Sequence, residues 1–251
     1  MSVEPILEEP VLPQSSGWMA AEEAPSGGVN PAGLERLTRL DLLLVTQQME
    51  QLEAVVGLKL TNQYIVKNIR GEKVYFVAED SNILERHLLG RCRPFHIRIF
   101  DEENHEIIHL QRRLRCSMCC FPCCLQKMTV ESPPGKVIGY VKQTWTTCHP
   151  RFLVQDSSKK TLLYITGPVC PCGFCGHDKY RVIDVEDDRD VGCIGKECNG
   201  VAKEVNPLSD NFGISFQLSL DAKMKAVLLG AVFLIDFMFY EIEMETKRIF
   251  F

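Results

Sequence analysis

Short apolar segments recur along most of the chain, and in several of them apolar and polar residues alternate. YIVKNI, KVYFVAE, FHIRIFD and KVIGYVKQTW are rich in Val, Ile, Tyr and Phe, and turn-forming sequences such as NIRGEK, DEENHE and DSSKK separate segments of this kind. Alternation with a period of two predicts strands that bury one face. Many short strands at close spacing predict a mainly β protein, a sandwich or a barrel, rather than repeated βαβ units.

The pattern differs at the start of the chain. Residues 1–32 are rich in Pro, Glu, Ser and Gly with few apolar residues in any regular period, which predicts a flexible leader before a domain over residues 33–251. The first apolar segment, LERLTRLDLLLVTQQMEQLEAVVG, has leucines spaced for a helix, but its part LDLLLVTQ also suits a buried strand. Periodicity alone leaves both readings open.

One segment, about residues 225–241, is almost wholly apolar and does not alternate, which predicts a helix. The fully apolar part before its single Asp is well short of the roughly 20 residues that span a bilayer, and an ionised Asp at the bilayer centre is costly. Length and charge therefore favour a buried core helix and leave a short membrane span as the alternative. The residues that define this helix are Ala226, Leu228, Phe233, Asp236, Phe237 and Phe239.

Composition narrows the partners and the compartment. The chain has 251 residues, and its formal net charge of -5 with a pI near 5.7 gives no general attraction to nucleic acid, so no specific nucleic-acid partner is expected. The acidic, proline-broken start MSVEPILEEP lacks the features of a secretory signal, so we expect the protein to begin in the cytosol. In that reducing compartment the twelve cysteines are not expected to form a disulfide framework.

Five cysteines fall within the ten residues RCSMCCFPCC. Cys116 and Cys119 are spaced C-x-x-C, as are Cys120 and Cys123, which is a spacing that zinc ligands use. However, two adjacent pairs separated by Phe-Pro would crowd a tetrahedral site, and no histidine lies nearby. Clustered cytosolic cysteines beside bulky and basic residues are typical of S-palmitoylation, because several acyl chains anchor a protein more stably than one. Metal or redox binding and buried structural thiols are the alternatives. The predicted palmitoylation sites are Cys116, Cys119, Cys120, Cys123 and Cys124.

A second cysteine group lies in GPVCPCGFCGHDKY. Cys170, Cys172, Cys175 and His177 could supply three sulfurs and one nitrogen to zinc, but their spacings match no zinc signature strongly. We favour the interpretation that this is a Gly/Pro-rich turn with small thiols packed inward. The alternative hypothesis is a cytosolic zinc or redox protein.

Several longer motifs occur in a fixed order: GLERLTRLDLLLVTQQ, CCFPCC, GYVKQTW, DNFG and KAVLLGAVFLIDFMFYE. Together they resemble the phospholipid scramblase family, and the likeness runs from about Gly33 to Glu241. The resemblance implies a Tubby-like fold, in which a closed antiparallel β-barrel surrounds a central hydrophobic C-terminal α-helix. The family is also described as inserting this helix through the membrane. The two placements exclude one another for a given molecule.

The resemblance also implies a calcium site. In scramblases the segment around DNFG resembles an EF-hand-like loop of twelve residues, which here would run from Leu208 to Ser219. Asp210 takes the third position, but Leu208 and Ser219 stand at the two ends where acidic ligands belong. Calcium needs about six to eight oxygen ligands. Asp210, with the nearby Asp221, therefore predicts a weak calcium site or none.

The function implied by the resemblance is calcium-dependent, ATP-independent, bidirectional movement of phospholipids between leaflets of the plasma membrane. The chain would lie at the cytoplasmic face, held by palmitate and, if it spans, by its short helix; an oligomer could build the polar route that headgroups need. The alternative is a palmitoylated, membrane-tethered adaptor that binds lipid or protein partners without moving lipid. Neither is an enzyme, and the sequence has no nucleophile elbow, zincin motif or phosphate loop.

Overall fold

The computed structural model of the chain describes residues 17–19, 31, 33–48, 62–80, 93–115, 125–169, 179–195 and 211–240. Within these ranges the chain forms twelve strands, a short helix α1 (Glu35–Thr38) and a longer helix α5 (Ala222–Ile235) that continues into the π-helical turn η3 (Asp236–Tyr240). The strands are β1 (Leu42–Gln48), β2 (Gln63–Lys67), β3 (Lys73–Asp80), β4 (Phe95–Phe100), β5 (Glu106–Arg112), β6 (Lys127–Glu131), β7 (Val137–Thr144), β8 (Arg151–Asp156), β9 (Thr161–Thr166), β10 (Tyr180–Asp184), β11 (Asp190–Gly195) and β12 (Asn211–Phe216).

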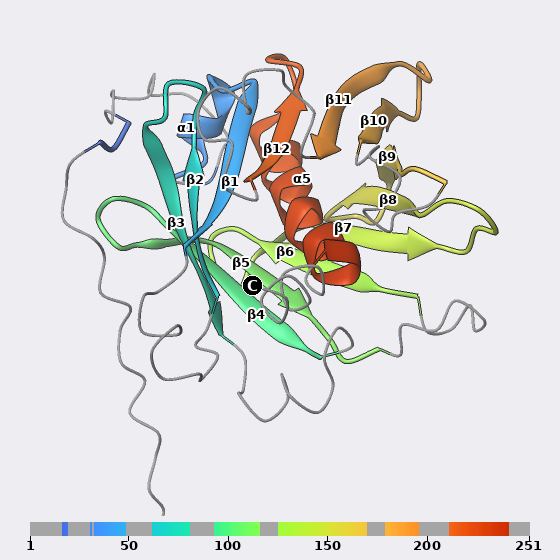
Figure 1. The fold of residues 1–251 in the computed structure, drawn as a ribbon, viewed down its shortest axis with the longest axis horizontal. Helices are drawn as coiled ribbons and strands as arrows, with labels where there is room; N and C mark the ends of the chain where they lie inside the picture. The colour runs from blue at the N-terminus through green and yellow to red at the C-terminus, as the bar shows by residue number, and fades with distance from the viewer. Residues whose placement is uncertain are drawn as a thin grey trace, which may run out of the picture.

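The strands form one closed antiparallel barrel (Figure 1). Each strand pairs with the next one in the chain, and β1 closes the ring by pairing with β12, where Leu44 lies opposite Gly213. The alternation predicted from the sequence appears in the burial of β6, in which Met128 and Val130 are buried and their neighbours are partly exposed. Closure leaves every strand paired on both sides. The prediction of a mainly β, closed antiparallel barrel around one hydrophobic helix is confirmed.

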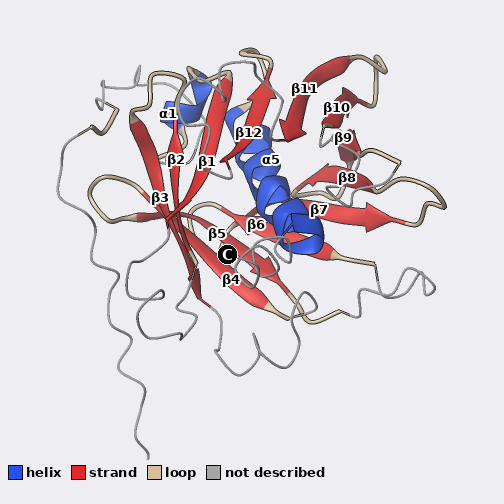
Figure 2. Cartoon of the chain, viewed as in Figure 1, coloured by secondary structure: helices blue, strands red, loops and turns tan. Residues whose placement is uncertain are grey.

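Helix α5 and turn η3 lie inside this barrel, as Figure 2 shows by colour. Because the helix is apolar all round, it is buried on every side rather than along one stripe. Ala226, Leu228 and Phe233 are fully buried and Phe237 almost so, whereas Asp236 and Phe239 are partly exposed. The helix therefore occupies the core, as the core-helix reading predicts, and it begins at Ala222, a few residues before the predicted start. Across the described residues, no helix is both long enough and apolar enough to cross a membrane.

Aromatic rings and one glycine fit α5 to the barrel wall. The rings of Tyr64 and Phe233 meet edge to face, with centroids 5.3 Å apart. A Cβ at Gly230 would lie 3.1 Å from Val130 Cγ2 and 3.2 Å from Leu110 Cδ2. The backbone of α5 therefore approaches β5 and β6 closely at this point, and a larger residue at Gly230 would force the wall or the helix to move.

The antiparallel order fixes which segments meet at each end of the barrel. Odd-numbered strands finish at one end, which we call the η3 end, and even-numbered strands finish at the other, which we call the α1 end. Helix α5 follows β12, so it starts at the α1 end. Phe237 of η3 packs on Phe95, the first residue of β4, with ring centroids 4.4 Å apart. The helix thus runs through the barrel from one end to the other.

A buried lysine helps to close the α1 end. Lys225 is fully buried, and its Nζ donates hydrogen bonds to the main-chain oxygens of Leu37, Leu40 and Leu218 at 2.9, 2.8 and 3.0 Å. Burial lowers the pKa of Lys225, and the carbonyl dipoles offset part of the cost of burying the ammonium. The ammonium therefore joins the first turn of α5 to α1 and to the turn after β12.

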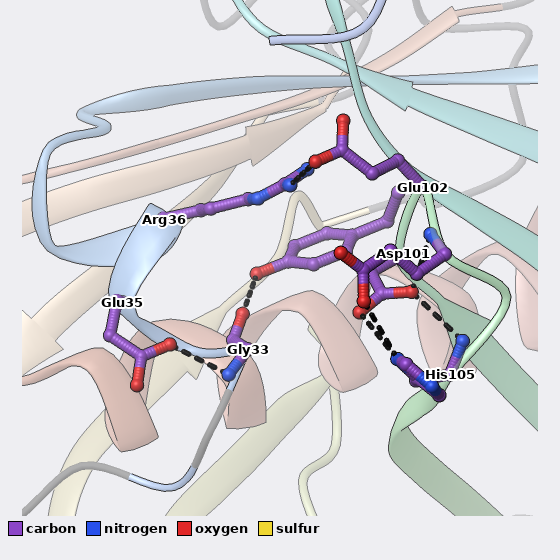
Figure 3. A network of polar contacts seen from close by, with 8 residues as sticks. Gly33, Glu35, Arg36, Asp101, Glu102 and His105 are labelled. Atoms are coloured by element: carbon purple, nitrogen blue, oxygen red, sulfur yellow. Dashed lines mark hydrogen bonds and ion pairs between the residues drawn. The ribbon is translucent and has the colours of Figure 1, made fainter. Parts of the chain in front are cut away.

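Polar contacts also fix α1 to the barrel (Figure 3). The main-chain N–H of Gly33 donates to Glu35 Oε2 at 2.6 Å, and Arg36 forms an ion pair with Glu102 in the turn between β4 and β5, also at 2.6 Å. Gly33 has φ +88°, in the left-handed region, and a Cβ there would lie 2.4 Å from Ile107 Cδ1. Only glycine fits this entry to α1 without strain.

The ambiguous apolar segment near the start divides into a helix and a strand. Glu35–Thr38 is helical, and Leu42–Gln48 is strand β1, which pairs with both β2 and β12. Part of the predicted leader contacts the barrel. Trp18 forms an isolated β-bridge with Lys73, and the main-chain N–H of Lys73 donates to Gly17 O at 2.7 Å.

Candidate functional site

The predicted palmitoylation segment enters and leaves at the η3 end. Its cysteines, Cys116, Cys119, Cys120, Cys123 and Cys124, lie outside the described residues, but Arg115 and Leu125 on either side are described. Arg115 Nη1 donates to Leu125 O at 3.1 Å, and Gln126 Nε2 donates to Arg115 O at 3.2 Å. These two hydrogen bonds hold the ends of the segment together beside β5 and β6.

Two other predicted segments have flanks at the same end. Cys170, Cys172, Cys175 and His177 lie outside the described residues, between the ends of β9 and β10. Asp210 also lies outside them, immediately before β12. In the part of the chain that the structure describes, no group of three or more His, Cys, Asp or Glu side chains is arranged to hold a metal ion.

Asp221, the second predicted calcium ligand, lies elsewhere. It is the exposed N-cap residue of α5, at the α1 end. Between it and Asp210 runs β12, an extended strand that pairs with β1 and β11. A strand of that length spans about 20 Å. The structure therefore does not bring Asp221 close to Asn211, the residue that follows Asp210.

The sequence did not indicate a buried polar cluster at the η3 end. Arg93 Nη2 and Glu79 Oε1 form an ion pair at 3.0 Å, with both side chains at most 1% exposed. Asn62 Nδ2 donates to the other oxygen of Glu79 at 2.7 Å, and the Arg93 guanidinium lies 4.8 Å from the centre of the Phe237 ring. The cluster therefore ties β3 and the start of β4 to η3. Arg93 directly precedes Pro94, and no sequence pattern links it to Glu79, so the pair is identified only by the structure.

A histidine pair lies on the outer face of β4 and β5. His109 Nδ1 lies 2.7 Å from Glu106 Oε1, and His109 Nε2 lies 3.0 Å from His96 Nδ1. A carboxylate only accepts hydrogen bonds, so in the neutral pair His109 donates from Nδ1 and accepts at Nε2 from His96. Burial first, and then His109, lower the pKa of His96.

This lowered pKa predicts a loss of stability on acidification. The unfolded imidazole titrates at about pH 6.5, so below that pH the unfolded chain binds more protons than the folded chain at this position. Stability is then lost as the pH falls through the folded pKa of His96. His96→Gln should flatten the dependence of the urea midpoint on pH below about 6.5, while His105→Gln, at an exposed histidine, should retain it. Equal slopes in wild type and His96→Gln would contradict this assignment.

The fold defines the class of protein: a closed antiparallel barrel that is filled by an apolar helix and has a cysteine-rich segment attached at one end. The sequence model of the Scramblase family matches residues 22–242. The chain is 45% identical to phospholipid scramblase 2 of Bos taurus over 238 residues, which cover 95% of this chain and 80% of that protein.

Human relatives give the same result. The chain is 46% identical to phospholipid scramblase 1 of Homo sapiens over 224 residues, 89% of this chain and 70% of that protein. It is 36% identical to phospholipid scramblase family member 5 of Homo sapiens over 233 residues, 91% of this chain and 86% of that protein. The chain belongs to the phospholipid scramblase family.

Proposed function

We propose that this chain moves phospholipids in both directions between the leaflets of the plasma membrane, in a calcium-dependent and ATP-independent way. The observation that carries the proposal is its similarity, over most of its length, to proteins named phospholipid scramblase. In this proposal the chain lies at the cytoplasmic face, attached by palmitate on Cys116, Cys119, Cys120, Cys123 and Cys124.

The filled barrel limits where lipid can move. A headgroup that crosses hydrocarbon needs a polar route, and α5 occupies the barrel interior with apolar side chains. In our proposal the route therefore follows the outer surface of the barrel, or lies between copies of the chain in an oligomer.

Calcium should act weakly in this chain. Of the two carboxylates that the sequence assigns to calcium, Asp221 stands at the α1 end, whereas Asn211, which follows Asp210, begins β12 at the other end, so we do not expect the two to share one calcium ion. Calcium affinity falls with the number of charged ligands. We therefore expect half-activation at about 10⁻⁴ to 10⁻³ M calcium, the range of weak protein sites.

Reconstitution tests this function. The purified full chain is placed in phosphatidylcholine liposomes that carry a fluorescent lipid in both leaflets, and an impermeant quencher is added at increasing calcium without nucleotide. Calcium-dependent loss of inner-leaflet fluorescence is expected. Asp210→Asn should raise the calcium concentration required, while Asp190→Asn, at an exposed carboxylate on β11, should not. No lipid movement at any calcium concentration, from folded protein, would contradict the proposal.

The second candidate is a palmitoylated adaptor that binds lipid or protein partners without moving lipid. The solid, helix-filled core favours it, because the barrel interior offers no polar route. An adaptor would bind membranes through its cysteine segment yet show no translocation in the same liposomes, so the one assay separates the two functions.

A further inference from the structure

The histidine pair on the outer face of β4 and β5 has the dimensions of a metal-binding pair. His96 Nδ1 and His109 Nε2 lie 3.0 Å apart, and the ring centres are 5.2 Å apart. Zinc–imidazole bonds are about 2.0–2.1 Å long, so two of them hold their nitrogen atoms roughly 2.9 Å apart at a right angle and roughly 3.3 Å apart at the tetrahedral angle. A zinc ion can therefore take the place of the shared proton after a small tilt of each ring.

His109 is already oriented as a metal ligand. Its Nδ1 donates to Glu106 Oε1 at 2.7 Å, which leaves a lone pair on Nε2, the atom that faces His96. Metal-bound histidines commonly donate their second ring N–H to a carboxylate, which fixes the ring and makes the other nitrogen more basic. Glu106 is placed to give His109 this support, and both side chains are less than a quarter exposed, at 23% and 22%.

His96 can supply the second nitrogen. In the hydrogen-bonded pair it donates from Nδ1, but a neutral imidazole carries one proton that either ring nitrogen can hold. With that proton on Nε2, Nδ1 of His96 presents its lone pair on the side where His109 Nε2 lies. The change of tautomer costs neither ring a proton, so two neutral imidazole nitrogens face one place.

The charges around the pair favour a cation. In the strand register, Asp80 of β3 lies opposite the histidine of β4, and Glu131 of β6 lies opposite the histidine of β5. Together with Glu106 they place three carboxylates on this face. One cation, Arg98, shares the face, and its Nη2 lies 3.5 Å from Asp80 Oδ2. Negative charge therefore predominates around the two rings, which attracts a divalent ion.

We propose that His96 Nδ1 and His109 Nε2 together bind a zinc ion. Within the described ranges no third His, Cys, Asp or Glu side chain is grouped with the pair to hold a metal, so water completes the four-coordinate shell that zinc prefers. This site is separate from the calcium of the proposed function. Calcium takes about six to eight oxygen ligands, whereas imidazole nitrogen suits zinc.

Zinc titration of the purified, reduced full chain tests this site. Calorimetry should show one more bound zinc ion in wild type than in His96→Gln or His109→Gln, because each change removes one of the two nitrogens. Any zinc held by cysteines is common to the three proteins and cancels in the comparison. In nuclear magnetic resonance spectra of the wild type, zinc should shift the imidazole signals of His96 and His109.

His105→Gln is the matched control. His105 lies between β4 and β5 with an exposed side chain, and its Nδ1 is 3.3 Å from Glu103 Oε2, outside the pair. This variant should bind as much zinc as wild type. Equal zinc stoichiometry in wild type and His96→Gln would overturn the site. An equal loss in folded His105→Gln would also overturn it, since histidine content alone would then explain the binding.

Glu106→Gln tests the support of His109. Glutamine keeps an oxygen that can accept from Nδ1 but removes the charge, so zinc should bind about ten-fold more weakly, at the low end of the range for changes beside metal-bound histidines. Glu103→Gln removes an exposed carboxylate between the same two strands and should leave the affinity unchanged. Unchanged affinity in Glu106→Gln would overturn the role assigned to Glu106.

Calcium separates this site from the proposed function. Calcium in excess should leave the two imidazole signals unshifted, because it prefers oxygen ligands. Shifts of both signals with calcium would overturn the zinc assignment. Lipid translocation is measured separately in liposomes, so His96→Gln that loses the zinc ion and keeps calcium-dependent translocation would support this site as one distinct from the proposed activity.

Discussion

Replacing Cys119, Cys120, Cys123 and Cys124 with alanine is expected to move the chain from the membrane fraction of cells to the soluble fraction. Each buried CH₂ of an acyl chain contributes about 0.8 kcal/mol to membrane binding, and one chain alone anchors only marginally. Cys116 would remain, so at most one acyl site of this segment is left. Fractionation and an acyl-exchange assay on the same samples measure both location and acylation.

Cys148 supplies the matched control. It is an exposed free cysteine in the turn between β7 and β8, outside the cysteine-rich segment 116–124 of the sequence. Cys148→Ala should leave the chain membrane-bound and acylated. Membrane retention of the four-cysteine variant, with acylation lost, would contradict acyl anchoring.

Glu79→Ala is expected to lower the free energy of unfolding by roughly 3–5 kcal/mol. The change removes the carboxylate that pairs with Arg93 and accepts from Asn62, in a cluster with almost no exposed surface. A charge left in such a place without its counter-ion costs far more than the pair contributes. Urea unfolding followed by circular dichroism measures the loss.

A double replacement and a surface pair test the cause. Glu79→Leu/Arg93→Met removes both charges and should recover most of the lost stability, because apolar residues of similar volume replace buried ion pairs with little net cost. Asp190→Ala, which breaks the exposed pair with Arg181, should leave the midpoint near that of wild type. A double variant as unstable as Glu79→Ala would attribute the loss to packing rather than to charge.

The elements with a clear period were predictable from the sequence. FHIRIFD alternates, and it is β4. KVYFVAE, which is β3, was predictable from its β-branched and aromatic residues instead, because four of its successive residues are buried. The apolar segment after Ala222 lacks alternation because its residues face the barrel wall on every side. Leu42–Gln48 was ambiguous, since its first four residues are all buried and a strand buried on both faces has no period. This segment is a strand because it pairs with β12, which lies far along the chain.

Long-range placement is what the sequence could not supply. Lys225 looks like a basic residue flanking an apolar helix, yet three carbonyl oxygens from α1 and the loops beside it hold its ammonium in the core. The outer face of β5, β6 and β7 likewise gathers Arg113, Lys127 and Lys159 from separate elements that only the strand register brings together. The predicted cysteine and calcium residues were identified from sequence motifs, and a motif does not show which distant residues lie beside it in the fold.

The closure of the ring has a consequence for biosynthesis. Among the described elements, β1 is the first strand and β12 the last, and α5 follows them in the chain. During translation, α5, which fills the barrel, therefore emerges from the ribosome after the strands that form its wall. Until Ala222 and the residues after it emerge, the inner apolar faces of the strands have nothing to pack against. Folding of the filled barrel must therefore finish after the wall has been translated.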